Sequence, residues 1–193
     1  MRNKKKLILI SPTNTIRKGF SLGNGTQTPL GLGIIAALTP ENFDIRIIDE
    51  VFEKFEYQEA DLVGITAFTN TVSRAYEIAA IYREKNIPVV LGGIHASMMP
   101  DEALHYVDSV VIGEAESVWA GLIQDFLQGS LKKIYKGEYL DMNKAAKPRF
   151  DLYRHNYESA NIQTTRGCPM DCEFCSVTQF NGHKYRERSV EEI

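Results

Sequence analysis

The sequence predicts an α/β fold, a doubly wound five-stranded parallel sheet of flavodoxin-like or Rossmann-like type, and three observations support this prediction. Short apolar runs rich in β-branched residues recur along the first two thirds of the chain, which is typical of buried parallel strands. The segments between these runs are long enough for helices, and several carry apolar residues at helical spacing. Because helices that alternate with parallel strands cover both faces of one sheet, the alternation predicts the fold class.

Each predicted strand has an unbroken apolar run, and the five runs lie at 6–10, 45–49, 62–66, 88–92 and 109–113. The predicted helices span 30–38, 72–82, 100–106 and 118–127. Thr28 and Pro29 are predicted to be the N-cap and first turn of the first of these helices. Asn86 and Gly129 are expected to end the second and the fourth, since both residues tolerate the left-handed conformation that follows a helix. Segment 50–60 is ambiguous.

Composition and charge exclude several classes of protein. The chain has 193 residues, of which 44% are hydrophobic and 24% charged, as in ordinary globular domains rather than disordered ones. The net charge of −3 argues against a nucleic-acid partner bound through phosphates. The first apolar run ends at Ser11 and Pro12, too soon for a signal peptide or a membrane span. We therefore expect a cytoplasmic protein with no membrane span.

The pattern changes after Gly129, which indicates a domain boundary. Residues 1–130 form the predicted sheet domain, 131–160 a hairpin and linker, and 161–193 the beginning of a second domain. This last part is predicted to contain a strand from Ile162, a cysteine loop, and a helix start capped at Ser189. Only 18 residues follow Cys175, whereas a β/α barrel takes roughly 250 residues, so the second domain is expected to be truncated.

Polar and glycine residues follow four of the predicted strands. In an open parallel sheet, ligands bind beyond the carboxyl ends of the strands, so these residues are candidates for cofactor contact. Each of them alone is more often a helix cap or a strand-ending turn than a ligand. The loop over 11–33 also holds Gly19, Gly23 and Gly25. The candidate cofactor-binding residues are Ser11, Gly31, Thr66, Thr69, Thr71, Gly92, Gly93, His95, Gly113, Glu114 and Glu116.

A dinucleotide site competes with this prediction. Gly31-Leu-Gly33-Ile-Ile-Ala36 fits the pattern G-x-G-x-x-A, and Asp49 ends the second strand, where a carboxylate binds ribose in such sites. The first glycine of that motif must lie in a tight turn directly after the first strand. Gly31 lies 21 residues beyond Ile10, so the context argues against a dinucleotide.

The three cysteines provide the most specific signal. Cys168, Cys172 and Cys175 have the spacing C-x3-C-x2-C and are the only cysteines in the sequence. Three thiolates on one loop can hold three irons of a 4Fe–4S cluster and leave the fourth iron open for another ligand. The alternatives are a zinc site with His183 as the fourth ligand, or unused thiols. The spacing favours the cluster, because zinc sites usually draw ligand pairs from two separate knuckles.

Residues 163–176, read as Gln-Thr-Thr-Arg-Gly-Cys-Pro-Met-Asp-Cys-Glu-Phe-Cys-Ser, resemble the cluster loop of radical S-adenosylmethionine enzymes. The preceding domain is similar to the cobalamin-binding domain of the corrinoid-dependent branch of that superfamily, the Fe–S oxidoreductases. This second resemblance is carried by Pro29-Leu-Gly31-Leu, Val63-Gly-Ile-Thr66 with Arg74-Ala-Tyr76, Gly92-Gly93-Ile-His95-Ala-Ser97 with Pro100-Asp-Glu102, and Gly113-Glu114-Ala-Glu116.

The resemblance implies three cofactors: a 4Fe–4S cluster on Cys168, Cys172 and Cys175, S-adenosylmethionine, and cobalamin. It implies the start of a radical S-adenosylmethionine barrel after the sheet domain, and reductive cleavage of S-adenosylmethionine for methyl transfer or related oxidoreductase chemistry. A small-molecule substrate and an electron donor such as flavodoxin or ferredoxin are the implied partners, and the fragment alone is expected to be inactive.

Two departures from the family pattern bear on cobalamin binding. The sequence lacks the Asp-x-His-x-x-Gly motif that supplies a histidine to cobalt, so a corrinoid would bind without that ligand. Ala115 stands where the family commonly has glycine. Two other readings therefore stay open: a radical enzyme whose first domain no longer binds cobalamin, and a Rossmann-like small-molecule module with a structural zinc tail.

Overall fold

A computed structural model describes residues 4–13 and 27–193. Its main feature is a six-stranded, all-parallel sheet in the order β2-β1-β3-β4-β5-β6. The first five strands confirm the doubly wound class and the flavodoxin-like order. The strands are β1 (Lys5–Ser11), β2 (Phe43–Asp49), β3 (Leu62–Thr66), β4 (Val89–Gly92), β5 (Ser109–Ile112) and β6 (Ile134–Lys136).

The sixth strand corrects the prediction of a five-stranded sheet followed by a hairpin over 131–140. β6 pairs in parallel with β5, with Val110 opposite Ile134. The chain returns parallel because a helix crosses over between the two strands. That helix ends at Leu127 with Gln128 as its C-cap, and Gly129 follows with a φ of +70°. The Ser130 amide donates to the Asp125 carbonyl, as in a Schellman motif.

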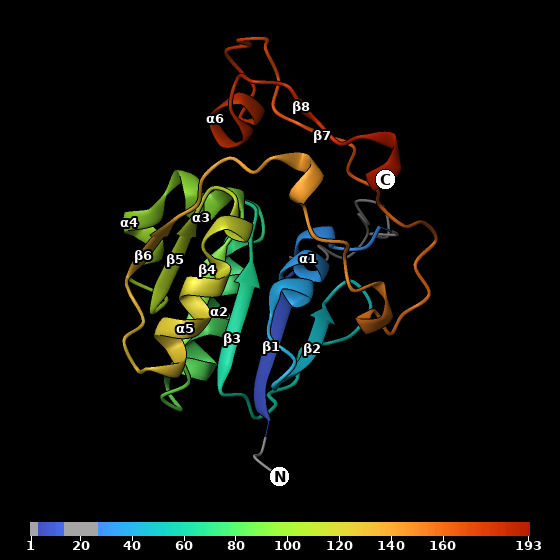
Figure 1. The fold of residues 1–193 in the computed structure, drawn as a ribbon. Coiled ribbons are helices and arrows are strands. Elements are labelled where there is room, and N and C mark those ends of the chain that lie inside the picture. Colours follow the sequence, from blue (N-terminus) through green and yellow to red (C-terminus); the bar gives the residue numbers. More distant parts are fainter. Residues whose placement is uncertain (1–3, 14–26) are drawn as a thin grey trace, which may run out of the picture.

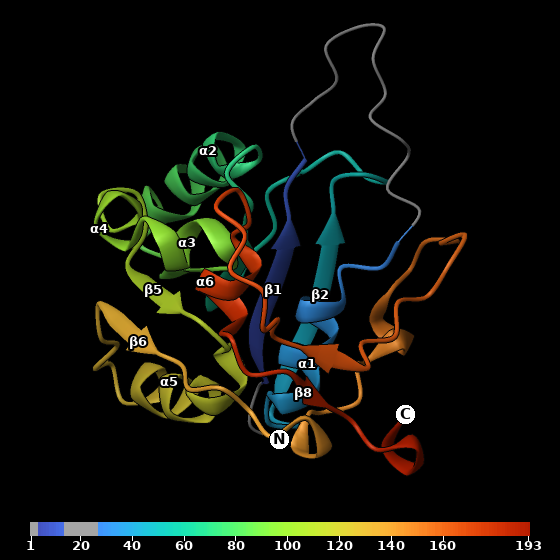
Figure 2. The ribbon, with the colours of Figure 1, turned by 90° about the horizontal axis from the view of Figure 1, so that it is seen from above.

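Helices cover both faces of the sheet (Figures 1 and 2). One face carries α2 (Val72–Arg83), α3 (Ile94–Met98) and α4 (Pro100–Ala103), and the other carries α1 (Leu30–Leu38) and α5 (Trp119–Leu127). Two details differ from the sequence predictions. Pro29 rather than Thr28 occupies the N-cap of α1, and no side chain caps that helix. Residues 54–60, in the ambiguous segment, form neither helix nor strand.

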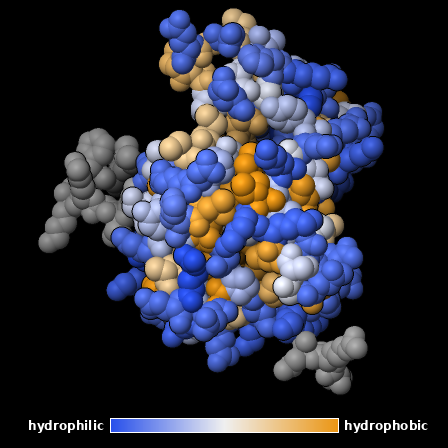
Figure 3. All heavy atoms as spheres, turned by 90° about the vertical axis from the view of Figure 1, so that its left-hand side faces the viewer, coloured by the Kyte–Doolittle hydropathy of each residue, from blue (hydrophilic) through white to orange (hydrophobic). Residues whose placement is uncertain are grey.

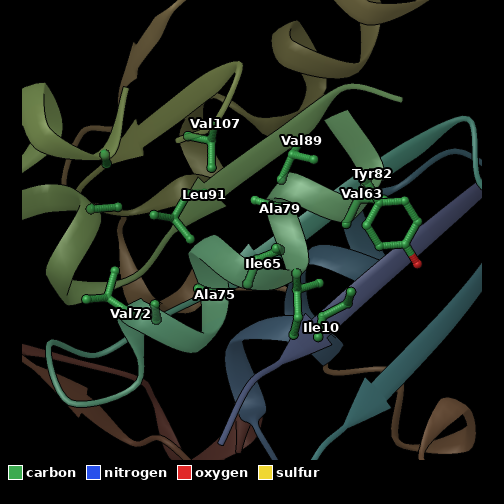
Figure 4. Close-up of a cluster of buried hydrophobic side chains, with 14 of the residues drawn as sticks. Ile10, Val63, Ile65, Val72, Ala75, Ala79, Tyr82, Val89, Leu91 and Val107 are labelled. Carbon is green, nitrogen blue, oxygen red and sulfur yellow. The ribbon is translucent and has the colours of Figure 1, made fainter. Parts of the chain in front are cut away.

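The core has two layers because successive side chains of a strand point to opposite faces. Ile8 and Ile10 of β1 pack under α2, whereas Leu7 and Leu9 pack under α1 and α5. Figure 4 shows the first layer, in which Tyr82 of α2 lies beside apolar side chains of the strands. Each of these five residues is at most 3% exposed, so the sheet is buried on both faces at β1.

Much of the rest of the chain lies over the carboxyl ends of the strands, while the part around residue 150 runs beside β2 (Figure 1). It has little regular structure: β7 (Thr165–Arg166) and β8 (Arg186–Glu187) form an antiparallel pair, and α6 (Val177–Asn181) lies between them. The remaining elements are the 3-10 turns η1 (Ala115–Ser117), η2 (Met142–Lys144), η3 (Phe150–Leu152) and η4 (Val190–Glu192). The strand predicted from Ile162 is thus two residues long, and the helix predicted at Ser189 is a single turn without a side-chain cap.

Hydrophilic residues cover most of the side of the molecule shown in Figure 3, where hydrophobic residues are exposed mainly as a patch near the middle. Among the residues that the structure describes, no helix has both the length and the apolar character needed to cross a membrane.

Candidate functional site

A cavity of about 390 Å³ lies at the carboxyl ends of β1, β3, β4 and β5. It continues down the face that α1 and α5 cover, where Leu9, Val90, Val111 and Trp119 form its apolar walls. Its volume is typical of small-molecule sites. The predicted cofactor-binding residues that line it are Gly31, Thr66, Gly92, Gly93, Gly113, Glu114 and Glu116. The strand-end reasoning thus places most of the candidates together.

Glycines leave the space that the cavity occupies. A Cβ atom on Gly31 or Gly92 would have no neighbour within 4 Å, so a larger side chain at either position would project into empty space. Gly93 is different, because its φ is +94° and a Cβ there would lie 2.8 Å from the Ala67 carbonyl oxygen. Gly92 therefore faces open space beside the cavity, while Gly93 is required by the backbone itself.

Glu114 lies at the polar end of the cavity, and its side chain is only 2% exposed. One of its oxygens accepts hydrogen bonds from the Leu140 amide at 2.7 Å and from Arg186 at 3.0 Å, and pairs with Arg166 at 3.1 Å. The other oxygen accepts from Arg186 as well. Burial alone would raise the pKa of Glu114, but these donors together lower it below its ordinary value. The carboxylate is therefore ionised and already occupied by protein donors.

Arg166 extends this arrangement into a chain of four charges. Its guanidinium pairs with Glu114 on one side and with Glu116 on the other, and its Nε donates to Gln163 at 2.8 Å. Two glutamates and two arginines alternate in the order Glu116, Arg166, Glu114, Arg186. The formal charges cancel, so the polar end of the cavity is close to neutral.

The other predicted site residues do not reach the cavity. His95 is 4% exposed and lies between Thr69, 3.3 Å from its Nδ1, and Tyr76, 3.3 Å from its Nε2. Thr71 accepts the Phe68 amide in a local turn, and Ser11 lies on β1 with its carbonyl bound to the Glu50 amide. α3 begins directly after Gly93 and turns His95 toward α2, which is why neighbours in sequence diverge in space.

The three cysteines share the loop between β7 and α6. Cys172 is exposed and Cys168 and Cys175 are half-buried, and all three thiols are free. The Cys175 amide donates to the Cys172 carbonyl at 3.0 Å. Within residues 4–13 and 27–193, no three His, Cys, Asp or Glu side chains lie close enough together to hold a metal ion. The loop thus carries three thiols that could bind a cluster, but in this conformation they do not converge on one point. His183, the fourth ligand of the alternative zinc site, is exposed.

Several residues that line the cavity were not predicted. Gln163, Arg166, Phe180 and Asn181 come from the C-terminal segment, so this segment forms one wall of the cavity. A signal for Arg166 existed in the sequence, since it directly follows the predicted strand from Ile162, and an arginine must find a carboxylate if it is buried. The motif Gly31 to Ala36 lies inside α1, which agrees with the argument against a dinucleotide turn. Gly19, Gly23 and Gly25 lie outside the described residues.

A model of the B12 binding domain matches residues 23–123. This match covers more than half of the chain and includes the carboxyl ends of β3, β4 and β5, three of the strands at the cavity. The chain belongs to the B12-binding domain family. The predicted likeness to a cobalamin-binding domain is thereby confirmed.

This B12-binding domain has relatives among curated enzymes. It is similar to bacteriochlorophyllide d C-8(2)-methyltransferase of Chlorobaculum tepidum, with 37% identity over 84% of this chain and 39% of the relative. Bacteriochlorophyllide d C-12(1)-methyltransferase of the same organism is 30% identical over 100% of this chain and 44% of the relative. Hopanoid C-2 methylase of Rhodopseudomonas palustris is 28% identical over 86% of this chain and 33% of the relative. The chain therefore spans less than half the length of these relatives.

Among solved structures, the B12-binding domain superposes on the cobalamin-dependent S-adenosylmethionine radical enzyme OxsB, whose structure has aqua-cobalamin bound. The TM-score is 0.75 at 18% identity, and the match covers 98% of this chain and 30% of OxsB. At this identity, the likeness establishes the shared fold, including the C-terminal segment that lies over the sheet.

Proposed function

We propose that this chain is the cobalamin-binding part of a radical S-adenosylmethionine enzyme that catalyses methyl transfer or related oxidoreductase chemistry. The observation that carries the proposal is the apolar cavity at the strand ends of a B12-binding domain, followed in sequence by the C-x3-C-x2-C loop. The curated relatives named as methyltransferases support the reaction class.

The residues around the cavity fit part of a corrinoid. Cobalamin is much larger than about 390 Å³, so only one portion of it can enter. The walls are mainly Leu, Ile, Val and Trp, and the charges at the polar end cancel, which suits an uncharged aromatic group such as the dimethylbenzimidazole base. Gly92, with open space in the direction of a Cβ, lets the backbone approach the rest of the cofactor closely.

We also propose that no histidine of the described chain ligates cobalt. Of the four histidines in the sequence, none lines the cavity as far as the described residues extend. His95, which is closest in sequence to the rim glycines, is buried in contacts with Thr69 and Tyr76. This agrees with the missing Asp-x-His-x-x-Gly motif.

Cys168, Cys172 and Cys175 are the proposed ligands of a 4Fe–4S cluster, which would supply the electron for cleavage of S-adenosylmethionine. The proposed organisation is a sheet domain over 1–130, a connecting segment over 131–160 and the start of a radical domain over 161–193. A small-molecule substrate, an electron donor such as flavodoxin or ferredoxin, and a cytoplasmic location complete the proposal. The location rests on three free thiols, which a reducing compartment preserves.

The test is hydroxocobalamin binding by the purified chain, followed by gel filtration and a visible absorption spectrum of the protein peak. We expect stoichiometric cobalamin with a spectrum that shows no nitrogen ligand below cobalt. Gly92→Leu fills the space beside the cavity and should weaken binding about tenfold or more, the equivalent of roughly 1.4 kcal/mol.

Gly121→Leu is the matched control, because Gly121 also has no atom within 4 Å of a Cβ but lies exposed on α5 away from the cavity. It should bind cobalamin like the parent chain. Colourless parent protein, or equal binding by the two variants, would overturn the proposal.

A further inference from the structure

The C-terminal segment contacts the sheet domain through buried charges. Arg166 belongs to β7 and Arg186 to β8, on either side of the cysteine loop, while Glu114 and Glu116 follow β5. The side chains of these four residues are between 2% and 10% exposed. The contacts join residues 50 and 72 positions apart in the sequence. The cysteine loop is thus tied at both ends to one point of the rim.

Both arginines make several hydrogen bonds in this contact, although the buried Nε of Arg186 has no partner among the described residues. Arg186 donates to Glu114, to the Leu140 carbonyl at 2.7 Å and to the Asn181 carbonyl at 3.0 Å. Arg166 donates to Gln163 and Glu116 and pairs with Glu114. A guanidinium that binds two partners through its planar fork fixes direction as well as distance. The arrangement therefore sets the orientation of β7 and β8, and not only their proximity to the sheet.

The same contact holds part of one wall of the cavity in place. α6 lies between the two arginines in sequence, and its residues Phe180 and Asn181 form part of the cavity wall. Asn181 is itself held through its carbonyl by Arg186. If the arginines were released, the wall formed by α6 would lose its attachment to the rim.

We infer that Glu114 and Glu116 are positioning residues that dock the cysteine loop onto the cofactor cavity, rather than groups that bind the corrinoid. Glu114 has no free oxygen for a ligand, because each of its oxygens already accepts from protein donors. Docking makes the cavity a composite of the sheet domain and the loop. Since coupling between two sites is reciprocal, loop docking strengthens corrinoid binding and a bound corrinoid strengthens loop docking. This coupling to corrinoid binding rests on the proposed function, whereas the docking of the loop does not.

The test of docking uses the full chain without metal or cobalamin, so it does not depend on the proposed function. Amide hydrogen exchange is followed in peptides covering 163–187 and, as an internal reference, in peptides of β1, β3 and β4. Arg186→Met should raise exchange in 163–187 roughly tenfold or more, because it removes one of the two guanidinium partners of the buried Glu114 and the hydrogen bonds of β8 to the Leu140 and Asn181 carbonyls, while the sheet peptides stay protected. Glu187→Gln, an exposed neighbour on β8, is the matched control and should exchange like the parent chain.

Two further variants separate docking from simple loss of packing. Arg186→Lys keeps the charge but not the fork, so its exchange should lie between those of the parent and Arg186→Met. Glu114→Gln combined with Arg186→Met removes both charges, and should exchange no faster than the worse single variant. If Arg186→Met also disturbs the sheet peptides, Glu116→Gln is the alternative variant, because Glu116 lies at the end of the chain of charges. It should raise exchange in the same peptides of 163–187 and leave the sheet peptides protected.

Cobalamin titration then tests the coupling. Arg186→Met should bind hydroxocobalamin more weakly than Glu187→Gln, and added cobalamin should slow exchange in 163–187 of the parent chain. Unchanged exchange in Arg186→Met overturns docking, and faster exchange with unchanged cobalamin affinity overturns coupling. A parent chain that binds no cobalamin contradicts the proposed function alone, since the exchange data without cofactor still decide docking.

Discussion

The sheet domain and the C-terminal segment are held in place by different forces. In the sheet, both faces are buried under helices, and the central side chains of β1, β3 and β4 are almost completely inaccessible to solvent. The segment after β6 instead leaves large apolar side chains exposed, among them Ile162, Met170, Phe174 and Val190. Met142 is buried and Leu152 and Tyr153 pack against the core, but the part that holds the cysteine loop is attached through ion pairs and hydrogen bonds. The comparison teaches that apolar burial determines the first region, whereas specific polar contacts determine the position of the cysteine loop in the second.

The largest expected effect comes from removing apolar volume in the sheet. Leu91 of β4 is completely buried, so Leu91→Ala should lower the free energy of unfolding by about 2–5 kcal/mol. Phe174→Ala removes a larger side chain that is 92% exposed and should change it by less than about 0.5 kcal/mol. Urea unfolding followed by circular dichroism measures both. Comparable losses would mean that the C-terminal segment shares the core.

A smaller loss is expected at the rim, where the two regions meet. Gly93→Ala puts a Cβ against the Ala67 carbonyl at a positive φ, and strain of this kind costs about 1–3 kcal/mol. Gly92→Ala is the matched control, with open space at the same end of β4. The same unfolding measurement should leave Gly92→Ala close to the parent chain, and equal losses would contradict the assigned conformations.

The connecting segment offers a third comparison. The Tyr157 hydroxyl donates to Asp49 at 2.9 Å. Burial raises the pKa of Asp49, although the Val51 amide and this hydroxyl oppose that shift. Tyr157→Phe should therefore raise the pKa of Asp49 further and cost about 0.5–1.5 kcal/mol. The pKa is measured by NMR titration of the carboxyl carbon. A pKa that fell instead would mean that the hydroxyl does not stabilise the carboxylate.

The smallest effect is expected from an exposed polar contact within the sheet domain. Burial tends to raise the pKa of Asp61, but hydrogen bonds from Lys5 and the Lys6 amide lower it below its ordinary value of 3.8. A lowered pKa means that the contact stabilises the fold above pH 3.8 and is lost as pH falls through the folded-state value. Asp61→Asn should cost less than about 1 kcal/mol at neutral pH, and the difference from the parent chain should shrink in acid. An undiminished difference at low pH would exclude the carboxylate as its source.

How much the sequence predicts differs between the two regions for the same physical reason. Runs such as Leu62 to Thr66 predict strands because burial on both faces requires continuous apolar residues. β6 was missed because its three residues include Lys136 and because an edge strand is buried on fewer sides. Local sequence patterns therefore predict the five buried strands, whereas the edge strand β6 depends on how the chain returns to the sheet.

The candidate site follows a similar division. The rim residues Thr66, Gly92 and Glu114 could be placed together because parallel strands bring their carboxyl ends to one edge. His95 could not be excluded from sequence, since its direction depends on where α3 begins. The pairing of Glu114 with Arg186 spans 72 residues, and no local pattern encodes which distant guanidinium a buried carboxylate will meet.

The order of the elements along the chain means that the sheet domain is synthesised before the cysteine loop. β6 ends at Lys136, whereas the first cysteine of the loop is residue 168 and its second arginine anchor is residue 186. Domains fold as units as the chain is made, the N-terminal one first. The six-stranded sheet, with Glu114 and Glu116 at its rim, is therefore complete before the three cysteines are synthesised. A newly made cysteine loop can then dock onto a folded sheet domain.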